Sequence, residues 1–419
     1  MMDSPSIGSQ DESVYPTPNS SILLDFDGSV CKRLITHDFS QHEVVPLIEA
    51  IFSSQDEVKM IGYLRGDDAQ TFIDVIDEAL DLPGLSSRLR RKCLSVLCKI
   101  CGRQALLPRS LQIPLCYDRS DTPLYQGGYA DVWKGEHRGR PVAVKALRVY
   151  STSDFDKITS RFCKEVVTWK TLHHPNVLPL LGVTMGKNHF AMASEWMVNG
   201  NINEFIRANR DTNRFELLKG VVRGLIYMHG QAMIHGDLKG ANILIDKNYH
   251  ARLADFGLLT VVSDPTNPTT SGSSAKGGTT RWMSPELLDP DQFGIKDSRA
   301  TKESDCYALG MVVYEVLSGR APFTPLKDII VMRKVIEGDR PERPDGPEGT
   351  WFTDDLWRTL NLCWEAQRGS RPGIGVVLEC LERVSGIWKP TPPQVCEDVE
   401  MDEDDWDLTT VSDSSGTVS

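Results

Sequence analysis

No run of apolar residues in this chain of 419 residues reaches the roughly 18 that a membrane-spanning helix requires. The first twenty residues contain no Lys, no Arg and no apolar core, so neither a secretory signal nor a transit peptide is expected there. Ten cysteines are far fewer than a disulfide-stabilised scaffold of this length would contain. Together these absences predict an intracellular protein, and by default a cytoplasmic one.

Basic residues are also missing from both ends of the chain. Residues 390–419 contain nine acidic side chains and residues 1–20 contain three more, which together equal the net charge of −12. The body between the ends is therefore balanced in charge, and no basic stripe favours a nucleic acid or a membrane surface as partner. We expect residues 1–20 to be a disordered tail and residues 387–419 to be an acidic disordered tail.

Apolar residues recur at helical spacing through residues 44–106, in three stretches. Pro83-Gly84 separates the second stretch from the third. The three apolar faces consist of Val44, Leu47, Ile48, Ile51 and Phe52, then of Phe72, Ile76, Ala79 and Leu80, and finally of Leu89, Val96, Leu97 and Ile100. Residues 21–118 are therefore predicted to form a small helical module. A module this short buries little apolar area alone, so it needs a partner surface, either in this chain or on another protein.

Two short patterns in this region resemble chemical sites. Asp25 and Asp27 have the spacing of the nucleophile and the acid in haloacid dehalogenase phosphatases. The residues that follow are helical and too few for the doubly wound sheet of such an enzyme, so we interpret the pair as part of a turn. Cys93, Cys98 and Cys101 have the spacing of ferredoxin ligands, but on a helix they spread over about 140° and cannot converge on one cluster. We interpret them as buried thiols.

From about residue 119 the pattern changes to strand-like segments, and from about residue 200 to long helical ones. Gly127 and Gly128 lie between two strand-like stretches, where the backbone N–H groups of a loop could bind phosphates or simply form a hairpin turn. Lys145 ends an apolar strand, and Glu165 follows on a helix. A lysine in a buried strand needs a partner, which a carboxylate about 20 residues later can provide, as in any structural salt bridge.

The next motifs occur in a fixed order. Ile-His-Gly-Asp-Leu-Lys-Gly-Ala-Asn-Ile-Leu at 234–244 is followed by Ala-Asp-Phe-Gly at 254–257, by Ser-Pro-Glu at 284–286, and then by Asp305 and Arg371. With the glycine loop, the strand lysine and the helix glutamate, this series resembles the eukaryotic protein kinase family. The resemblance covers residues 119–386. It implies an α+β, two-lobed fold with a small five-stranded N-lobe carrying one helix and a larger helical C-lobe, here preceded by the helical module.

Finer features resemble one branch of that family. The stretches 174–177, 195–197 and 281–283 are similar to those of tyrosine-kinase-like kinases. Lys239 and the pair Gly278-Thr279 before Ser-Pro-Glu resemble serine/threonine rather than tyrosine kinases. A helical segment ahead of such a kinase domain is similar to kinases abundant in mushroom-forming fungi.

The resemblance implies ATP and Mg²⁺ as cofactors and a protein as substrate. Phosphoryl transfer depends on positioning and charge neutralisation more than on covalent chemistry. Asp237 would be the catalytic base and Lys239 would steady the γ-phosphate. Lys145 would clamp the α- and β-phosphates, and Glu165 would fix that lysine.

The remaining site residues are also implied by the resemblance. Asn242 and Asp255 would hold Mg²⁺, while Gly127 and Gly128 would cover the phosphates. Adenine would be sandwiched by Leu124, Val132, Ala143 and Leu244, read by the backbone of Glu195 and Met197, and bordered by Ser194 as gatekeeper. Glu286 and Arg371 would form a buried structural pair, and Asp305 would brace the catalytic loop.

Three positions depart from the family pattern. Tyr125 and Ala130 replace the first and third loop glycines, and a side chain at 125 limits positive φ and adds bulk beside the nucleotide. Gly236 replaces the arginine that commonly receives an activation-loop phosphate, which argues against that control. The predicted function is a serine/threonine kinase with an HGD, non-RD catalytic loop. The alternatives are a pseudokinase that binds nucleotide and presents the helical module to a signalling partner and, least favoured, a dehalogenase-type phosphatase.

Overall fold

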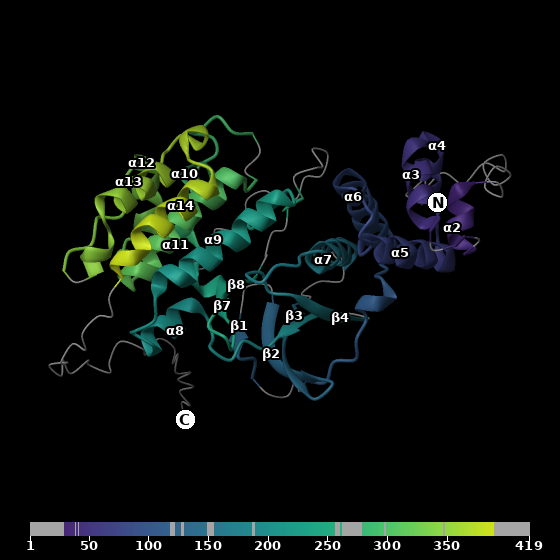
Figure 1. The fold of residues 1–419 in the computed structure, drawn as a ribbon, viewed down its shortest axis with the longest axis horizontal. Coiled ribbons are helices and arrows are strands. Elements are labelled where there is room, and N and C mark those ends of the chain that lie inside the picture. The colour runs from purple at the N-terminus through teal and green to yellow at the C-terminus, as the bar shows by residue number, and fades with distance from the viewer. Residues whose placement is uncertain are drawn as a thin grey trace, which may run out of the picture.

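A computed structural model defines the structure of most of the chain between residues 29 and 388 (Figure 1). The described residues are 29–37, 39–40, 42–117, 122–126, 130–148, 155–186, 189–255, 260–261, 279–296, 299–346 and 348–388. The predicted tail 1–20, residues 389–419 of the predicted acidic tail, Asp25 and Asp27, Gly127 and Gly128, and most of the segment after Asp255 lie outside these residues. The first two residues of the acidic tail are described, and the helical turn Ser385–Ile387 extends into it.

The chain begins with helices, as predicted for the helical module. They are α2 (Val30–Ile35), α3 (Val44–Ser53), α4 (Gln55–Ile61), α5 (Gly66–Leu80) and α6 (Ser87–Gln104). The short helices α2 and α4 were not expected, because six and seven residues are too few for a clear apolar period. Glu57 on α4 accepts hydrogen bonds from the N–H groups of Val30 and Cys31, both at 2.9 Å, and so caps the start of α2.

The three closely spaced cysteines of α6 are buried thiols, as the sequence indicated. Burial raises the pKa of Cys93 to about 12 and that of Cys98 to about 11, so both stay protonated and inert at neutral pH.

A twisted antiparallel sheet and one helix follow the helical module. The sheet has the order β1-β2-β3-β5-β4, and the predicted five-stranded lobe with one helix is confirmed. Its elements are β1 (Tyr125–Gln126), β2 (Ala130–His137), β3 (Arg140–Leu147), α7 (Phe155–Lys170), β4 (Leu180–Gly186) and β5 (His189–Glu195). Arg138 and Gly139, both with positive φ, form the tight turn between β2 and β3.

The second lobe is mainly helical, as expected. Its elements are α8 (Ile202–Ala208), α9 (Arg214–Gly230), β6 (Met233–Ile234), β7 (Ile243–Ile245), β8 (Ala251–Leu253), β9 (Thr260–Val261), α10 (Pro285–Leu288), α11 (Lys302–Ser318), α12 (Asp328–Glu337), α13 (Asp354–Cys363) and α14 (Ile374–Val384). The predicted pair of Glu286 and Arg371 is present, with two hydrogen bonds of 2.6 and 2.7 Å between buried side chains. Among the described helices, none is both long and apolar enough to cross a membrane.

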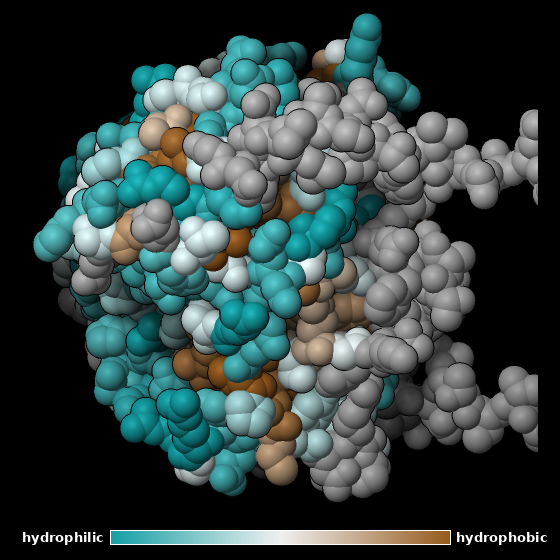
Figure 2. All heavy atoms as spheres, turned by 90° about the vertical axis from the view of Figure 1, so that its right-hand side faces the viewer, coloured by the Kyte–Doolittle hydropathy of each residue, from teal (hydrophilic) through white to brown (hydrophobic). Residues whose placement is uncertain are grey.

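The helical module lies against the N-lobe rather than apart from it. In Figure 1, α6 runs beside α7, and α7 lies between α6 and the sheet. Figure 2 looks onto the end of the molecule that the module occupies; that face is mostly hydrophilic, with hydrophobic atoms in small separate patches. Most apolar side chains of the module are therefore turned inward, toward its own core and toward α7.

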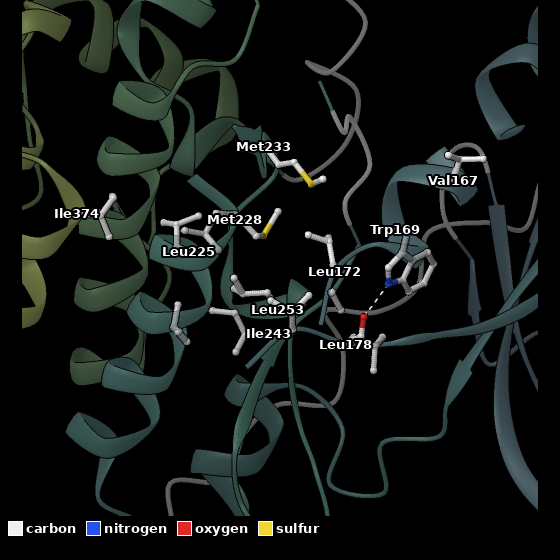
Figure 3. Packing of buried hydrophobic residues seen from close by; sticks show 14 of the residues in the cluster. Val167, Trp169, Leu172, Leu178, Leu225, Met228, Met233, Ile243, Leu253 and Ile374 are labelled. Atoms are coloured by element: carbon white, nitrogen blue, oxygen red, sulfur yellow. Dashed lines mark hydrogen bonds between the residues drawn. The ribbon is translucent and has the colours of Figure 1, made fainter. Parts of the chain in front are cut away.

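The buried core continues from α7 into the C-lobe. Trp169 of α7 donates a hydrogen bond of 2.7 Å from its indole nitrogen to the carbonyl of Leu178 (Figure 3). Leu172 and Leu178 lie next to Leu253 of β8, and beyond them comes Met228 of α9. The two lobes thus share one apolar core on the side of the cleft where α7 ends.

Candidate active site

A buried carboxylate in the first turn of α11 supports the catalytic loop at 234–242. Asp305 accepts hydrogen bonds from the backbone N–H groups of His235 (2.8 Å) and Gly236 (2.9 Å). Asp305 Oδ2 also lies 2.9 Å from Nε2 of His229, which is its side-chain partner. The prediction that Asp305 braces this loop is confirmed, and the brace works because both loop amides point at one fixed anion.

A second buried carboxylate supports the loop and was missed by the sequence reasoning. Glu315 of α11 accepts hydrogen bonds from the Gly240 N–H (2.9 Å), the Asn203 amide (2.6 Å) and the Trp282 indole (2.9 Å). Burial raises the pKa of Glu315, although these three donors partly offset that effect. The available signal was a single acidic residue within the apolar stretch Met311–Leu317, because a lone charge there requires partners.

Asp237 lies at the centre of a hydrogen-bonded group. The amide nitrogen of Asn242 donates to Asp237 Oδ2 and to its backbone carbonyl, both at 2.8 Å. The ammonium of Lys239 lies 3.2 Å from the same Oδ2 and donates to Thr279 Oγ1 at 2.8 Å. No partner for Asp237 Oδ1 occurs among the described residues. The carboxylate is thus held in one orientation with an oxygen left to accept a proton or a hydrogen bond.

Lys145 contacts Asp255 directly across the cleft. β3 carries Lys145, and Asp255 follows β8 with a positive φ of 54°, an uncommon backbone conformation for a residue other than glycine. The ammonium of Lys145 lowers the pKa of Asp255, against the effect of burial. Burial alone would lower the pKa of Lys145, but the nearby carboxylates of Asp255 and Glu165 raise it. Both groups are therefore charged at neutral pH.

Glu165 is near this pair without joining it. Lys145 and Glu165 are both described residues, and no ion pair joins them in this structure. Burial raises the pKa of Glu165, and the charge of Lys145 lowers it less. The structure thus pairs Lys145 with Asp255 and leaves Glu165 close enough to interact with its charge, without the predicted ion pair.

The predicted nucleotide-binding residues come from both lobes. Ala143 of β3 pairs with Ser194 of β5, which is buried, and Lys145 pairs with Met192. Leu124 donates its N–H to the carbonyl of Val132 at 2.9 Å. From the C-lobe, Leu244 of β7 forms a bridge with Asn201. Glu195 ends β5, Met197 follows it in the connection between the lobes, and Gly127 and Gly128 lie outside the described residues.

The residues expected to bind Mg²⁺ offer hard oxygen ligands. The side-chain nitrogen of Asn242 is committed to Asp237, and no partner of its side-chain oxygen occurs among the described residues. Asp255 shares one carboxylate oxygen, Oδ1, with Lys145. One amide oxygen and one carboxylate at neighbouring positions fit the oxygen preference of Mg²⁺.

Comparisons with known proteins agree with this geometry. Residues 119–381 match the family described as protein tyrosine and serine/threonine kinase. The chain is 28% identical over 268 residues to serine/threonine-protein kinase STY46 of Arabidopsis thaliana, covering 62% of this chain and 43% of that protein. It is 27% identical over 267 residues to serine/threonine-protein kinase VIK of the same plant, covering 62% and 58%. It is 28% identical over 281 residues to the probable serine/threonine-protein kinase drkD of Dictyostelium discoideum, covering 66% and 20%.

The match is confined to part of each relative. The chain spans less than two thirds of the length of each of these three proteins, and the family match begins after the helical module. Because that match covers more than half of the chain and coincides with the two-lobed region, it decides the family. The chain belongs to the protein kinase family.

Proposed function

We propose that this protein is a serine/threonine protein kinase that transfers the γ-phosphate of ATP to protein hydroxyl groups. The observation that carries the proposal is the set of contacts around Asp237, in which Asn242 and Lys239 orient one carboxylate oxygen and leave the other available. Lys145 and Asp255 face this group across the cleft.

Each side chain has a distinct part in this proposal. Asp237 accepts the proton of the attacking hydroxyl, and Lys239 neutralises charge on the transferred phosphate. Asn242 and Asp255 would hold Mg²⁺, which supplies charge neutralisation of the phosphates when bound. Lys145 holds the remaining phosphates once Asp255 binds the metal.

Serine and threonine are the proposed acceptors. The support is the 2.8 Å bond from Lys239 to Thr279, which ties the catalytic loop to the segment before Ser-Pro-Glu. The relatives named above also carry serine/threonine kinase names. We place the chain in the tyrosine-kinase-like branch, with similarity to fungal kinases, on the stretches 174–177, 195–197 and 281–283.

The pseudokinase reading rests on Tyr125, Ala130 and Gly236. Tyr125 is half exposed, and the catalytic loop is fully braced with Gly236 in place. Because every residue expected to contact metal, phosphate or the accepting hydroxyl is retained, catalysis is the favoured reading.

Replacing the proposed base tests this function. Asp237→Asn should keep nucleotide binding and lose about 10²–10⁴ in the rate of phosphate transfer to a peptide substrate, because general-base catalysis is removed. Asp255→Asn should raise the Mg²⁺ concentration needed for half-maximal rate, because a carboxylate ligand is lost. Asp345→Asn, at an exposed aspartate in a loop, is the matched control. Equal turnover of wild type and Asp237→Asn would refute the assignment.

The location and partners are proposed on separate grounds. An intracellular, cytoplasmic location is supported by the cysteines, since all nine within the described residues are free thiols. The proposed partners are a protein substrate and, for the helical module, a surface of this chain or of another protein, with neither nucleic acid nor membrane.

A further inference from the structure

The outer side of α7 is covered by α6. Ser160, Lys164 and Thr168 recur every four residues and therefore lie along one side of α7. Cys98 of α6 places its sulfur 3.6 Å from Thr168 Oγ1 and 4.0 Å from the Lys164 carbonyl oxygen. At Gly102 the two helices approach so closely that a Cβ atom would lie 2.8 Å from Ser160 Oγ and 3.2 Å from the Ser160 carbonyl oxygen. A large side chain at this position would therefore push the two helices apart.

A buried ion pair joins the helical module to the end of α7. Lys170, the last residue of α7, places its ammonium 2.7 Å from Asp77 Oδ1 of α5. Asp77 is 2% exposed, and its other oxygen accepts a 2.7 Å hydrogen bond from Ser110. Asp81 lies 3.6 Å from the same ammonium. A charge buried this deeply depends on its partner, so the pair fixes one arrangement of α5 against α7.

The segment between the helical module and the kinase domain is also fixed in place. Gln70 donates to the Leu107 carbonyl at 3.0 Å, and the Arg109 N–H donates to Asp74 at 2.8 Å. Ile113 then donates its N–H to Val183 of the edge strand β4 at 3.0 Å. The module is therefore held at both ends of this connection and does not hang on a free linker.

Both carboxylates that surround Lys145 depend on α7. Glu165 follows Lys164 by one residue, so it lies about 100° round the helix from the stripe that α6 covers. After α7 the chain forms hydrogen bonds with β8: Leu253 donates to the Asn176 carbonyl at 2.9 Å, and Leu178 donates to the Leu253 carbonyl at 2.8 Å. Asp255 lies two residues beyond Leu253, next to the core shown in Figure 3.

We propose that the helical module at residues 29–104 is a built-in positioning partner of α7. Its contacts at Lys170, Thr168 and Ser160 hold α7 at the place from which Glu165 and Asp255 act on Lys145. Detachment of the module lowers the rate of phosphate transfer. Asp77 and Gly102 are positioning residues in this scheme. The expected effect on the rate rests on the proposed kinase function, whereas the expected effect on hydrogen exchange in α7 does not.

The test uses full-length variants at saturating ATP and peptide. Asp77→Lys, Lys170→Asp and Gly102→Leu should each lower kcat at least ten-fold and speed amide hydrogen exchange in α7. Combining Asp77→Lys with Lys170→Asp should recover most of the lost rate. The matched controls are Gly84→Leu, where nothing lies within 4 Å of an added Cβ, and Asp56→Lys, at a carboxylate that is 88% exposed. Both controls should match the wild type.

A second comparison separates positioning from loss of stability. In a Glu165→Gln background, Gly102→Leu should cause a smaller further loss of kcat than it causes in the wild type, because part of its effect passes through Glu165, whereas the loss from general destabilisation would add in full. Three outcomes would each overturn the proposal. The interface variants could keep the full rate despite faster exchange in α7, or they could have a higher rate than the wild type. In the Glu165→Gln background, the loss of kcat could be additive.

The experiment also distinguishes failure of the proposed kinase function from failure of the proposed positioning role. If the wild type transfers no phosphate, the kinase assignment fails, while exchange in α7 and Mg-ATP affinity still compare the interface variants with Gly84→Leu. Unchanged exchange and affinity would then overturn the inference. A cross-link tests the contact itself, because Gly102→Cys with Ser160→Cys should form a disulfide that preserves these properties. Failure to form it in oxidised, folded protein would count against the contact.

Discussion

At Gly236 the backbone has a φ of 76°, in the left-handed region that favours glycine. The position matters because the Gly236 N–H is one of the two amides that Asp305 binds, and Asp237 follows directly. The sequence reasoning treated Gly236 only as the loss of an arginine. The structure adds that this glycine allows the loop to turn without strain just before the proposed base.

Gly236→Ala is expected to destabilise the protein by about 1–2 kcal/mol, because an alanine at positive φ is strained. The strain should also shift Asp237 and lower the rate of phosphate transfer. Gly230→Ala is the control, since Gly230 lies at the end of α9 with nothing within 4 Å of an added Cβ. Equal free energies of unfolding for the two variants in urea would contradict the argument.

The sequence predicted the structural roles of some residues but not of others. Asp305 and the pair of Glu286 and Arg371 were predictable, because ordered motifs tie them to known neighbours. Glu315 and Asp77 were not, because their importance depends on donors more than 30 residues away in the chain. The contact of Lys145 with Asp255 instead of Glu165 depends on where α7 comes to lie, which no local pattern specifies.

Within α11, Glu315 is a buried acid whose ionisation costs free energy. Because burial raises its pKa above the usual 4.5, the folded state binds the proton more tightly than the unfolded state does. The stability that protonation contributes is fully present below the unfolded pKa and is lost as pH rises through the folded pKa.

Comparison with Glu315→Gln, which does not titrate, isolates this effect. The free energy of unfolding of the wild type, relative to that variant, should fall as pH rises from about 4 to about 7. Urea denaturation of both proteins across this range measures the difference, and the other titrating groups cancel. A difference that is constant or rises with pH would show that the hydrogen bonds from Gly240, Asn203 and Trp282 outweigh burial.

Helices were easier to predict than their packing. Periodicity predicted α3, α5 and α6, because each is long enough to show an apolar face. The same periodicity left open which surface those faces meet, since pairing of α6 with α7 joins residues far apart in the chain, such as Cys98 and Lys164, which are 66 residues apart. Gly102 could be recognised as a contact residue only once both helices were in place.

In the whole molecule, the contacts that we propose to control the active site all lead to Lys145. The helical module, α7 and β8 form one connected body on one side of it, while α11 braces the catalytic loop from the other. The two-lobed architecture could be predicted from the order of motifs. The apolar faces of the module also indicated that it needs a partner surface, but not that this surface is α7, because the residues in contact are far apart in the chain.

In the part of the chain that the structure describes, the arginine that commonly receives a phosphate on the segment after Asp255 is missing. Gly236 replaces the usual arginine. Arg281, an alternative cation that follows this segment, is already used: it pairs with Asp328 at 2.9 Å and donates to the carbonyls of Pro322, at 2.9 Å, and Leu326. A phosphate orders a loop by gaining charge-assisted hydrogen bonds. Recruiting Arg281 would break three existing contacts.

Activity should therefore not depend on phosphorylation of this segment. Its hydroxyl-bearing residues include Thr266, Thr269, Thr270, Ser271, Ser273 and Ser274, all of which lie outside the described residues. Phosphatase-treated protein, and a variant with all six replaced by Ala, should keep most of the activity of untreated wild type toward a peptide. The absence of that arginine also removes one uncompensated positive charge that a phosphate would otherwise have to neutralise before catalysis. A ten-fold fall in kcat, about 1.4 kcal/mol in the barrier, would show instead that a phosphate on this segment displaces the contacts of Arg281 and controls the enzyme.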